Sequence, residues 1–169
     1  MRKKVPFIVF IVAVVSANWL TTHFGFVPVG FGLVATAGTY AAGLALVARD
    51  FVHETSGIRG VLLAIVAGTA LSFITSDQFI ALASGVAFAV SEVADTAIYA
   101  PLRRKTWRLA VVLSSLVGAV IDTALFIGIA FGFAAITAEV MAGQLVGKVL
   151  WVAVPVALVG GILRSRRAR

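Results

Sequence analysis

Apolar stretches follow one another along almost the whole chain and are separated by short polar or basic breaks. A helix needs about 20 apolar residues to cross the hydrocarbon core of a bilayer. Six stretches approach that length, from Val5 to Thr22, Val27 to Ala48, Gly60 to Thr75, Gln78 to Pro101, Leu109 to Phe133 and Gly143 to Leu163. The pattern predicts an all-α integral membrane protein, a bundle of six transmembrane helices that forms a single polytopic domain over residues 1–169.

The composition excludes a water-soluble globule. Hydrophobic residues make up 61% of the 169 residues, charged residues only 12%, and the mean hydropathy is +1.08. So few polar side chains do not cover a soluble surface. Because cysteine is absent, disulfides, thiolate metal ligands and a cysteine nucleophile are excluded. The two histidines, His23 and His53, are predicted in different loops, so we expect neither a metal site nor a cofactor.

The net charge of +7 comes from basic residues at the ends of the predicted helices. Binding to nucleic acid requires a basic face, which this distribution does not provide, so we expect no nucleic-acid partner. If both termini are cytoplasmic, all thirteen Lys and Arg residues outside the predicted helices fall on the cytoplasmic side. This positive-inside pattern predicts a multi-pass protein of the cytoplasmic (inner) membrane, surrounded by lipid, with cytoplasmic N- and C-termini.

Four ionisable side chains lie inside the predicted spans, namely Glu92, Asp95, Asp122 and Lys148. Each costs at least about 2.5 kcal/mol in hydrocarbon, which makes each a candidate functional residue. At a rise of about 1.5 Å per residue, Glu92, Asp122 and Lys148 fall in one central-to-outer layer. Asp122 and Lys148 are also symmetric about the predicted turn between the last two helices. We therefore predict that they are level neighbours, which either form a structural ion pair or line a cavity.

A polar seam follows one face of the predicted fourth helix at intervals of three and four residues. It consists of Ser84, Phe88, Ser91, Glu92, Asp95 and Tyr99. A seam with two carboxylates is not tolerated against lipid, so we expect it to face the bundle interior or water.

The first and sixth predicted helices add further polar positions. Asn18 lies about 21 Å from Lys4, in the same layer, and is followed by Trp19. Trp19 either stacks on a substrate or belongs to the interfacial aromatic belt. Cleavage of this segment as a signal peptide would remove both residues, and we expect it to be retained. The sixth helix carries a stripe of Gln144, Lys148, Trp151 and Pro155.

A charged segment follows the second predicted helix on the cytoplasmic side and includes Arg49, Asp50 and Glu54. It is either a solvated loop or a helical extension. Because Asp50 and Glu54 are four residues apart, an extension would place both on one face, where they could close the cytoplasmic mouth.

Three motifs together resemble the VUT family, also called the queuosine precursor transporter family. They are Asp50-Phe51-Val52-His53-Glu54-Thr55-Ser56-Gly57, Ser91-Glu92-Val93-Ala94-Asp95-Thr96-Ala97-Ile98-Tyr99 and Ile121-Asp122-Thr123-Ala124-Leu125-Phe126. The resemblance runs from about the second helix to the end of the chain. This chain has Ser56 where larger members have Tyr, and residues 113–119 lack the Asn and Gln of those members.

The resemblance implies uptake of a small modified purine base, a deazaguanine-type queuosine precursor, and no enzymatic activity. A carboxylate accepts two parallel hydrogen bonds from a guanine-type edge, and aromatic side chains stack on the ring. The expected substrate-binding residues are Glu92, Asp95, Asp122, Lys148, Asn18, Trp19, Tyr99 and Gln144. The expected residues of the cytoplasmic mouth are Asp50, Glu54 and Arg49.

Other classes stay open. The chain is also similar to the substrate-binding S-components of energy-coupling-factor vitamin importers, whose partner-docking surface the Ala13-x-x-x-Ala17 repeat resembles. An intramembrane enzyme is a third class, because paired carboxylates perform acid/base chemistry. The run from Gly143 to Val149 lacks the spacing of a phosphate loop, so no nucleotide site is expected there. Self-association into a homo-oligomer, the coupling ion and the need for an ATPase partner are left undecided.

Overall fold

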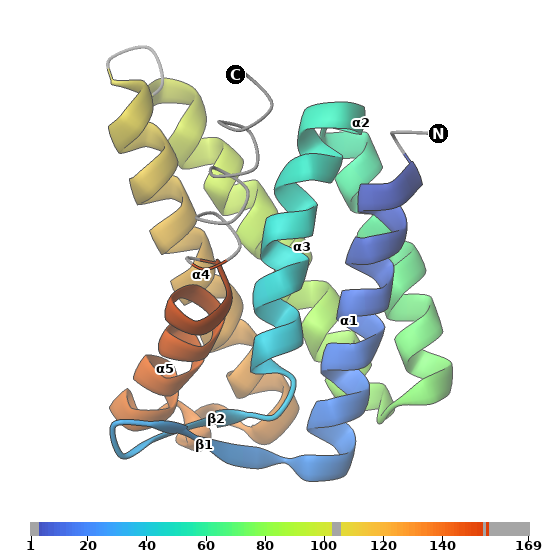
Figure 1. The fold of residues 1–169 in the computed structure, drawn as a ribbon, viewed down its shortest axis with the longest axis vertical. Coiled ribbons are helices and arrows are strands. Elements are labelled where there is room, and N and C mark those ends of the chain that lie inside the picture. The colour runs from blue at the N-terminus through green and yellow to red at the C-terminus, as the bar shows by residue number, and fades with distance from the viewer. Residues whose placement is uncertain (1–3, 103–105, 154, 156–169) are drawn as a thin grey trace.

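The computed structural model describes residues 4–102, 106–153 and 155 (Figure 1). These residues form a mostly helical bundle with one small β-hairpin. Four helices of this described part are long and apolar enough to cross a membrane, at Lys4–Phe24, Thr39–Thr75, Gln78–Tyr99 and Leu113–Phe131. Helical membrane architecture therefore agrees with the prediction from hydropathy.

Helix α1 spans Lys4–Phe24 and leads into an antiparallel hairpin of β1, Phe26–Gly30, and β2, Leu33–Thr36. The predicted start of a span at Val27 is therefore wrong. The chain reverses because Gly30 and Gly32 have positive φ, at 95° and 72°, which glycine adopts without a steric penalty. Phe31 between them also has a positive φ of 57°, which is uncommon for a residue with a side chain. The hairpin lies at the end of the bundle opposite the start of α1 (Figure 1).

Helix α2 spans Thr39–Thr75 but breaks at Gly57, where φ is 65° and ψ is −172°. Such a backbone conformation is essentially restricted to glycine. The chain turns back here, so the two arms of α2 run in opposite directions (Figure 1). The predicted helix end at Ala48 is wrong, because residues 49–56 continue the first arm, whereas the second arm begins after Gly57, close to the predicted start at Gly60. The helical extension is confirmed and the solvated loop is not. His53 lies in this arm and His23 in α1, so neither histidine lies in a loop.

From Gln78 onward, the described residues form α3, α4, a short 3-10 helix and a last helical region made of α5 and η2. Helix α3 spans Gln78–Leu102 and α4 spans Trp107–Phe131, close to the predicted limits. A short 3-10 helix, Phe133–Ala135, leads to α5, Ala138–Leu145, which continues as the π-helix η2, Val146–Ala153. The sixth predicted helix thus begins before Gly143, because Thr137 caps α5 by accepting a hydrogen bond from the amide of Val140. Its predicted end at Leu163 lies outside the described residues.

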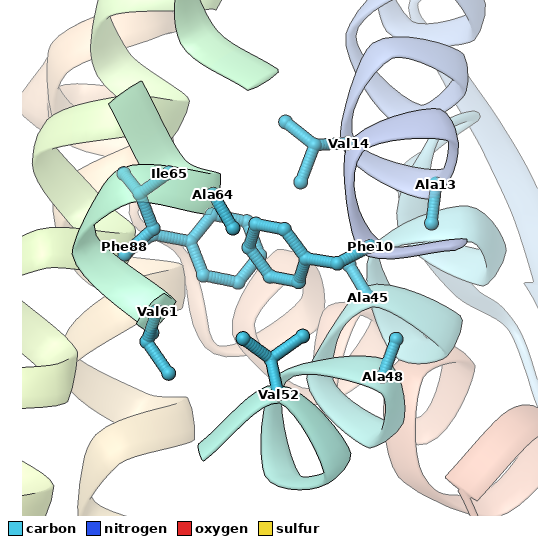
Figure 2. Packing of buried hydrophobic residues seen from close by; sticks show 10 residues of the cluster. All are labelled: Phe10, Ala13, Val14, Ala45, Ala48, Val52, Val61, Ala64, Ile65 and Phe88. Atoms are coloured by element: carbon cyan, nitrogen blue, oxygen red, sulfur yellow. The ribbon is translucent and has the colours of Figure 1, made fainter. Parts of the chain in front are cut away.

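The main hydrophobic core lies between α1, the two arms of α2 and α3 (Figure 2). At its centre the rings of Phe10 and Phe88 meet edge to face, with their centroids 5.7 Å apart. Ala13 and Ala17 are buried on the inner side of α1, and a Cβ at Gly38 would lie 2.0 Å from the Ala17 carbonyl oxygen. The small residues of α1 therefore serve packing within this bundle.

Candidate functional site

A deeply buried ion pair joins α4 and η2. The Lys148 ammonium donates hydrogen bonds to Asp122 Oδ2 at 2.7 Å and to Thr123 Oγ1 at 3.2 Å. Asp122 and Lys148 are 4% and 2% exposed. The predicted proximity of these two residues is confirmed. Gly43 lets η2 lie close to α2, because a Cβ at this position would lie 2.7 Å from the Lys148 carbonyl oxygen.

The ion pair lines a cavity at the centre of the bundle, between α1, α2, α3, α4 and η2. The polar part of the wall consists of Asn18, Thr21, Ser84, Asp122 and Lys148. The remainder consists of Ala17, Gly38, Ala42, Phe88 and Phe126. The sequence prediction had placed Asn18, Asp122 and Lys148 in one layer, and the structure brings all three to one cavity.

The cavity is narrow in this conformation. The space open to the centre of a water-sized sphere is about 20 Å³. A single water needs about 10–15 Å³ by that measure, so the cavity admits about one water molecule. A solute as large as a purine base enters only if the surrounding helices separate.

Asn18 has a fixed position in the cavity wall. Its side-chain amide donates to Ser72 Oγ at 2.9 Å, which ties α1 to the second arm of α2. Asn18 and Ser72 are 2% and 0% exposed, so this bond is shielded from solvent. With the Lys148 ammonium, the Asp122 carboxylate and two aromatic rings, the wall offers a cation, an anion, an amide and stacking surfaces around one space.

A second buried ion pair lies next to this cavity. Arg49 Nη1 lies 3.1 Å from Glu92 Oε2, and Arg49 Nη2 lies 2.8 Å from Asp50 Oδ1. Arg49 is 8% exposed and Glu92 is 2% exposed. Glu92 follows the cavity residue Phe88 by one helical turn, so the two polar regions are contiguous along α3.

Arg49 is therefore misplaced in the sequence prediction, which assigned it to a hydrated cytoplasmic segment. Asp50 and Glu54 are exposed on the same arm of α2. The error arose because the helix was predicted to end at Ala48. A helix that continues to Gly57 places Arg49 about two turns before its end, where a buried carboxylate offsets the loss of hydration.

The remaining predicted residues lie away from the cavity wall. Asp95 is next along the seam, and within the described part of the chain its buried Oδ1 has no hydrogen-bond partner. Tyr99 is one turn further along α3 and is partly buried. Gln144 is fully buried against the hairpin threonines Thr36 and Thr39.

Trp19 is 42% exposed and stacks on His23, with the ring centroids 4.2 Å apart. This position fits the interfacial aromatic belt that the sequence analysis left open. The aromatic rings that line the cavity are instead Phe88 and Phe126. Phe126 ends the motif that contains Asp122, but it was not predicted as a site residue. The signal was its spacing of four residues from Asp122, which places both on one face of α4.

A family model described as "Putative vitamin uptake transporter" matches residues 76–161, just over half of the chain. The chain belongs to this family. The expected assignment to the VUT family is thus confirmed. The matched part of the chain runs from before α3 into the sixth helical region and contains Glu92, Asp95, Asp122 and Lys148. No curated protein and no solved structure matches the chain.

Membership of a transporter family has direct consequences for the site. A multi-pass membrane protein that takes up small molecules needs a polar path through its helices, and the described bundle has polar residues at its centre. The family is described as one of transporters, which is consistent with the expectation that the protein carries a solute and does not catalyse a reaction. The cavity and the adjacent Arg49–Glu92 pair are the candidate path.

Proposed function

We propose that this transporter carries a small modified purine base, a deazaguanine-type queuosine precursor, into the cell across the cytoplasmic membrane. The observation that carries the proposal is the central cavity, where Asn18, Asp122 and Lys148 meet two phenylalanine rings. We take this cavity as the binding site.

The chemistry of the wall suits such a base. A guanine-type edge presents a ring N–H and an amino group side by side, and a carboxylate such as Asp122 accepts both. The neighbouring carbonyl oxygen of the base then accepts from Lys148. Phe88 and Phe126 stack on the ring faces. In this arrangement the base replaces direct contacts between Asp122 and Lys148, so neither charge is left without a partner.

Glu92 and the other seam residues extend this path toward the break at Gly57. The Arg49–Glu92 pair closes the path on that side of the cavity, and Asp50 and Glu54 lie at its mouth. Asp95 and Tyr99 continue along α3. A base that leaves the cavity would meet Glu92 first, since Glu92 follows Phe88 by one turn.

The proposed topology has six spans with both termini in the cytoplasm. In it the two arms of α2 cross the membrane separately, and α5 with η2 begins the sixth span. The hairpin then lies on the outer side and Gly57 on the cytoplasmic side. Since the cavity admits about one water, transport proceeds by alternating separation of the helices at its two ends.

A substrate-binding module of an ATP-driven importer is the alternative. It was favoured by the Ala13-x-x-x-Ala17 repeat as a docking surface, yet both alanines are buried within the bundle, at 3% and 6% exposure. We therefore propose a transporter that acts without an ATPase partner. Stable co-purification of ATPase subunits with the tagged protein would favour the importer module instead.

Uptake of labelled deazaguanine bases by cells that cannot make them tests the substrate. Expression of the protein should restore uptake, and Asp122→Asn should abolish it. Glu139→Gln is the matched control, because Glu139 is an exposed carboxylate in the first turn of α5. Failure of the wild-type protein to take up any deazaguanine base, while another labelled vitamin accumulates, would overturn the assignment.

A further inference from the structure

The β-hairpin is held against the sixth helical region by a buried amide. Gln144 in α5 accepts a hydrogen bond at Oε1 from Thr39, and its Nε2 donates to Thr36 Oγ1 at 2.9 Å. Thr36 belongs to β2 and Thr39 begins α2, so one side chain joins the hairpin, α2 and α5. Gln144 and Thr39 are fully buried, and Thr36 is 2% exposed. Water therefore does not compete for these bonds.

The other strand is attached by the indole of Trp151. Its Nε1 donates to the Val29 carbonyl oxygen in β1 at 3.1 Å. Gly143 lets β2 lie close to α5, because a Cβ there would be 2.0 Å from the Val34 carbonyl oxygen. Gly147 lets the start of α2 lie close to η2, because a Cβ there would be 2.3 Å from Thr39 Cγ2. Each strand is thus bound to the same helical region by a specific hydrogen bond.

The hairpin is also continuous with the cavity wall. Gly38, two residues after β2, lines the cavity beside Thr21, and its amide donates to Thr21 Oγ1 at 3.2 Å. Lys148, which also lines the cavity, lies between Gln144 and Trp151 at spacings of four and three residues. The segment that carries the cavity cation therefore also carries both attachments of the hairpin.

The segment between the two attachments has an unusual helical form, because η2 is a π-helix. π-Helical turns are rare and occur frequently at functional sites. Conversion of Val146–Ala153 to an α-helix would change the angle between Gln144 and Trp151 around the helix axis. The two attachments could then not both be kept on one rigid hairpin.

We propose that the β-hairpin is the gate at its end of the cavity, and that Gln144 and Trp151 are positioning residues that hold it shut. Displacement of Lys148 from Asp122 moves the segment between the two attachments and releases the hairpin. The proposal rests on the proposed transport function. It concerns how the cavity opens and does not depend on which solute enters.

Opening of the cavity is measurable because the chain contains no cysteine. In a Ser84→Cys background the introduced thiol in the cavity wall is the single one. We would measure its rate of modification by a small membrane-impermeant maleimide, applied separately to right-side-out and inverted vesicles. Modification in denaturant gives the total thiol, and protein abundance reports misfolding.

Loosening the attachments should speed modification from the hairpin side only. Trp151→Phe keeps the ring and removes the N–H donor, and Thr36→Val keeps the shape and removes the hydroxyl. Each should raise the rate about fivefold, the factor that corresponds to the loss of one neutral hydrogen bond. Thr75→Val is the matched control, because the Thr75 hydroxyl bonds to the Leu71 carbonyl within its own helix.

Locking the hairpin should have the opposite effect. A disulfide formed by Thr36→Cys with Gln144→Cys ties β2 to α5 and should stop modification of the cavity thiol from the hairpin side. The control disulfide, Val27→Cys with Ala35→Cys, joins facing residues within the hairpin and should leave the rate unchanged. Equal rates in Trp151→Phe, in the locked variant and in the parent would overturn the gate. Failure of deazaguanine uptake would instead overturn the substrate and leave this result standing.

Discussion

At the scale of residues, four of the buried charges that the structure describes form two pairs. Asp122 with Lys148 and Glu92 with Arg49 are both almost inaccessible to solvent. Removing one partner from a buried pair leaves an uncompensated charge, whereas removing both leaves only a loss of shape. This asymmetry separates a real pair from two charges that happen to be close.

Double-mutant analysis of Asp122 and Lys148 tests the first pair. We expect Asp122→Asn and Lys148→Met each to lower the free energy of unfolding by about 3–5 kcal/mol, because the remaining charge stays buried. The double variant should lose less than either single variant. Thermal unfolding of purified protein in detergent measures this, and simple addition of the two single effects would contradict the pairing.

Glu92 calls for a test that separates folding from recognition, because its carboxylate is the partner of Arg49. Glu92→Gln should destabilise the protein, and Arg49→Met in the same chain should recover most of that loss. Uptake of a labelled deazaguanine base should stay reduced in both variants, because the path next to the cavity then lacks its carboxylate. Uptake that recovers together with stability would make Glu92 a purely structural residue.

The two pairs differed in how far the sequence revealed them. The Asp122–Lys148 pair followed from the symmetry of the last two predicted helices about their turn. The Arg49–Glu92 pair did not, because the predicted helix boundary at Ala48 assigned Arg49 to water. An error of a few residues at a helix end changes whether an arginine is solvated or must find a buried partner.

At the scale of elements, the break of α2 at Gly57 decides how the two arms are connected. With φ of 65° and ψ of −172°, the backbone at this position is strained for any residue that has a Cβ, although an added Cβ would meet no neighbouring atom within 4 Å. Gly57→Ala should lower the free energy of unfolding by about 1–3 kcal/mol.

A control for that substitution lies in α4. Gly118 is helical, and an added Cβ would meet the nearest atom, Asp95 Cβ, at an ordinary 3.6 Å. Gly118→Ala should therefore be neutral or slightly stabilising. Unfolding of both variants in the same detergent gives the comparison, and equal effects at the two positions would rule out a specific constraint at Gly57.

The hairpin is the element that the sequence analysis missed. Residues 26–36 carry no charge, so their hydropathy alone predicts the start of a transmembrane helix. Pro28, Gly30 and Gly32 were the available signal, because glycines with positive φ make the reversal between two short strands. The strands are stable here because Gln144 and Trp151 bind them, and these partners lie more than a hundred residues away in the chain.

At the scale of the whole molecule, Arg49 and Lys148 are buried in ion pairs. The proposed topology places the other Lys and Arg residues on the cytoplasmic side. Reporter fusions at Thr137 and at Arg169 test it. A fusion at Thr137 should show periplasmic activity and one at Arg169 cytoplasmic activity, because Lys and Arg resist translocation. A periplasmic signal at Arg169 would remove one span from the proposed arrangement.

The sequence by itself determined that this protein lies in a membrane, that it is helical and to which family it belongs. Apolar length, the placement of basic residues and short motifs are properties of contiguous residues, so they can be recognised without knowing how the helices pack. Only the tertiary structure decided which charges are partners, which polar residues reach the cavity and where the hairpin is held. Those outcomes depend on the approach of helices distant in sequence, as where Gly43 allows Lys148 to lie beside α2. Such contacts are fixed by packing in three dimensions, to which no local pattern in the chain corresponds.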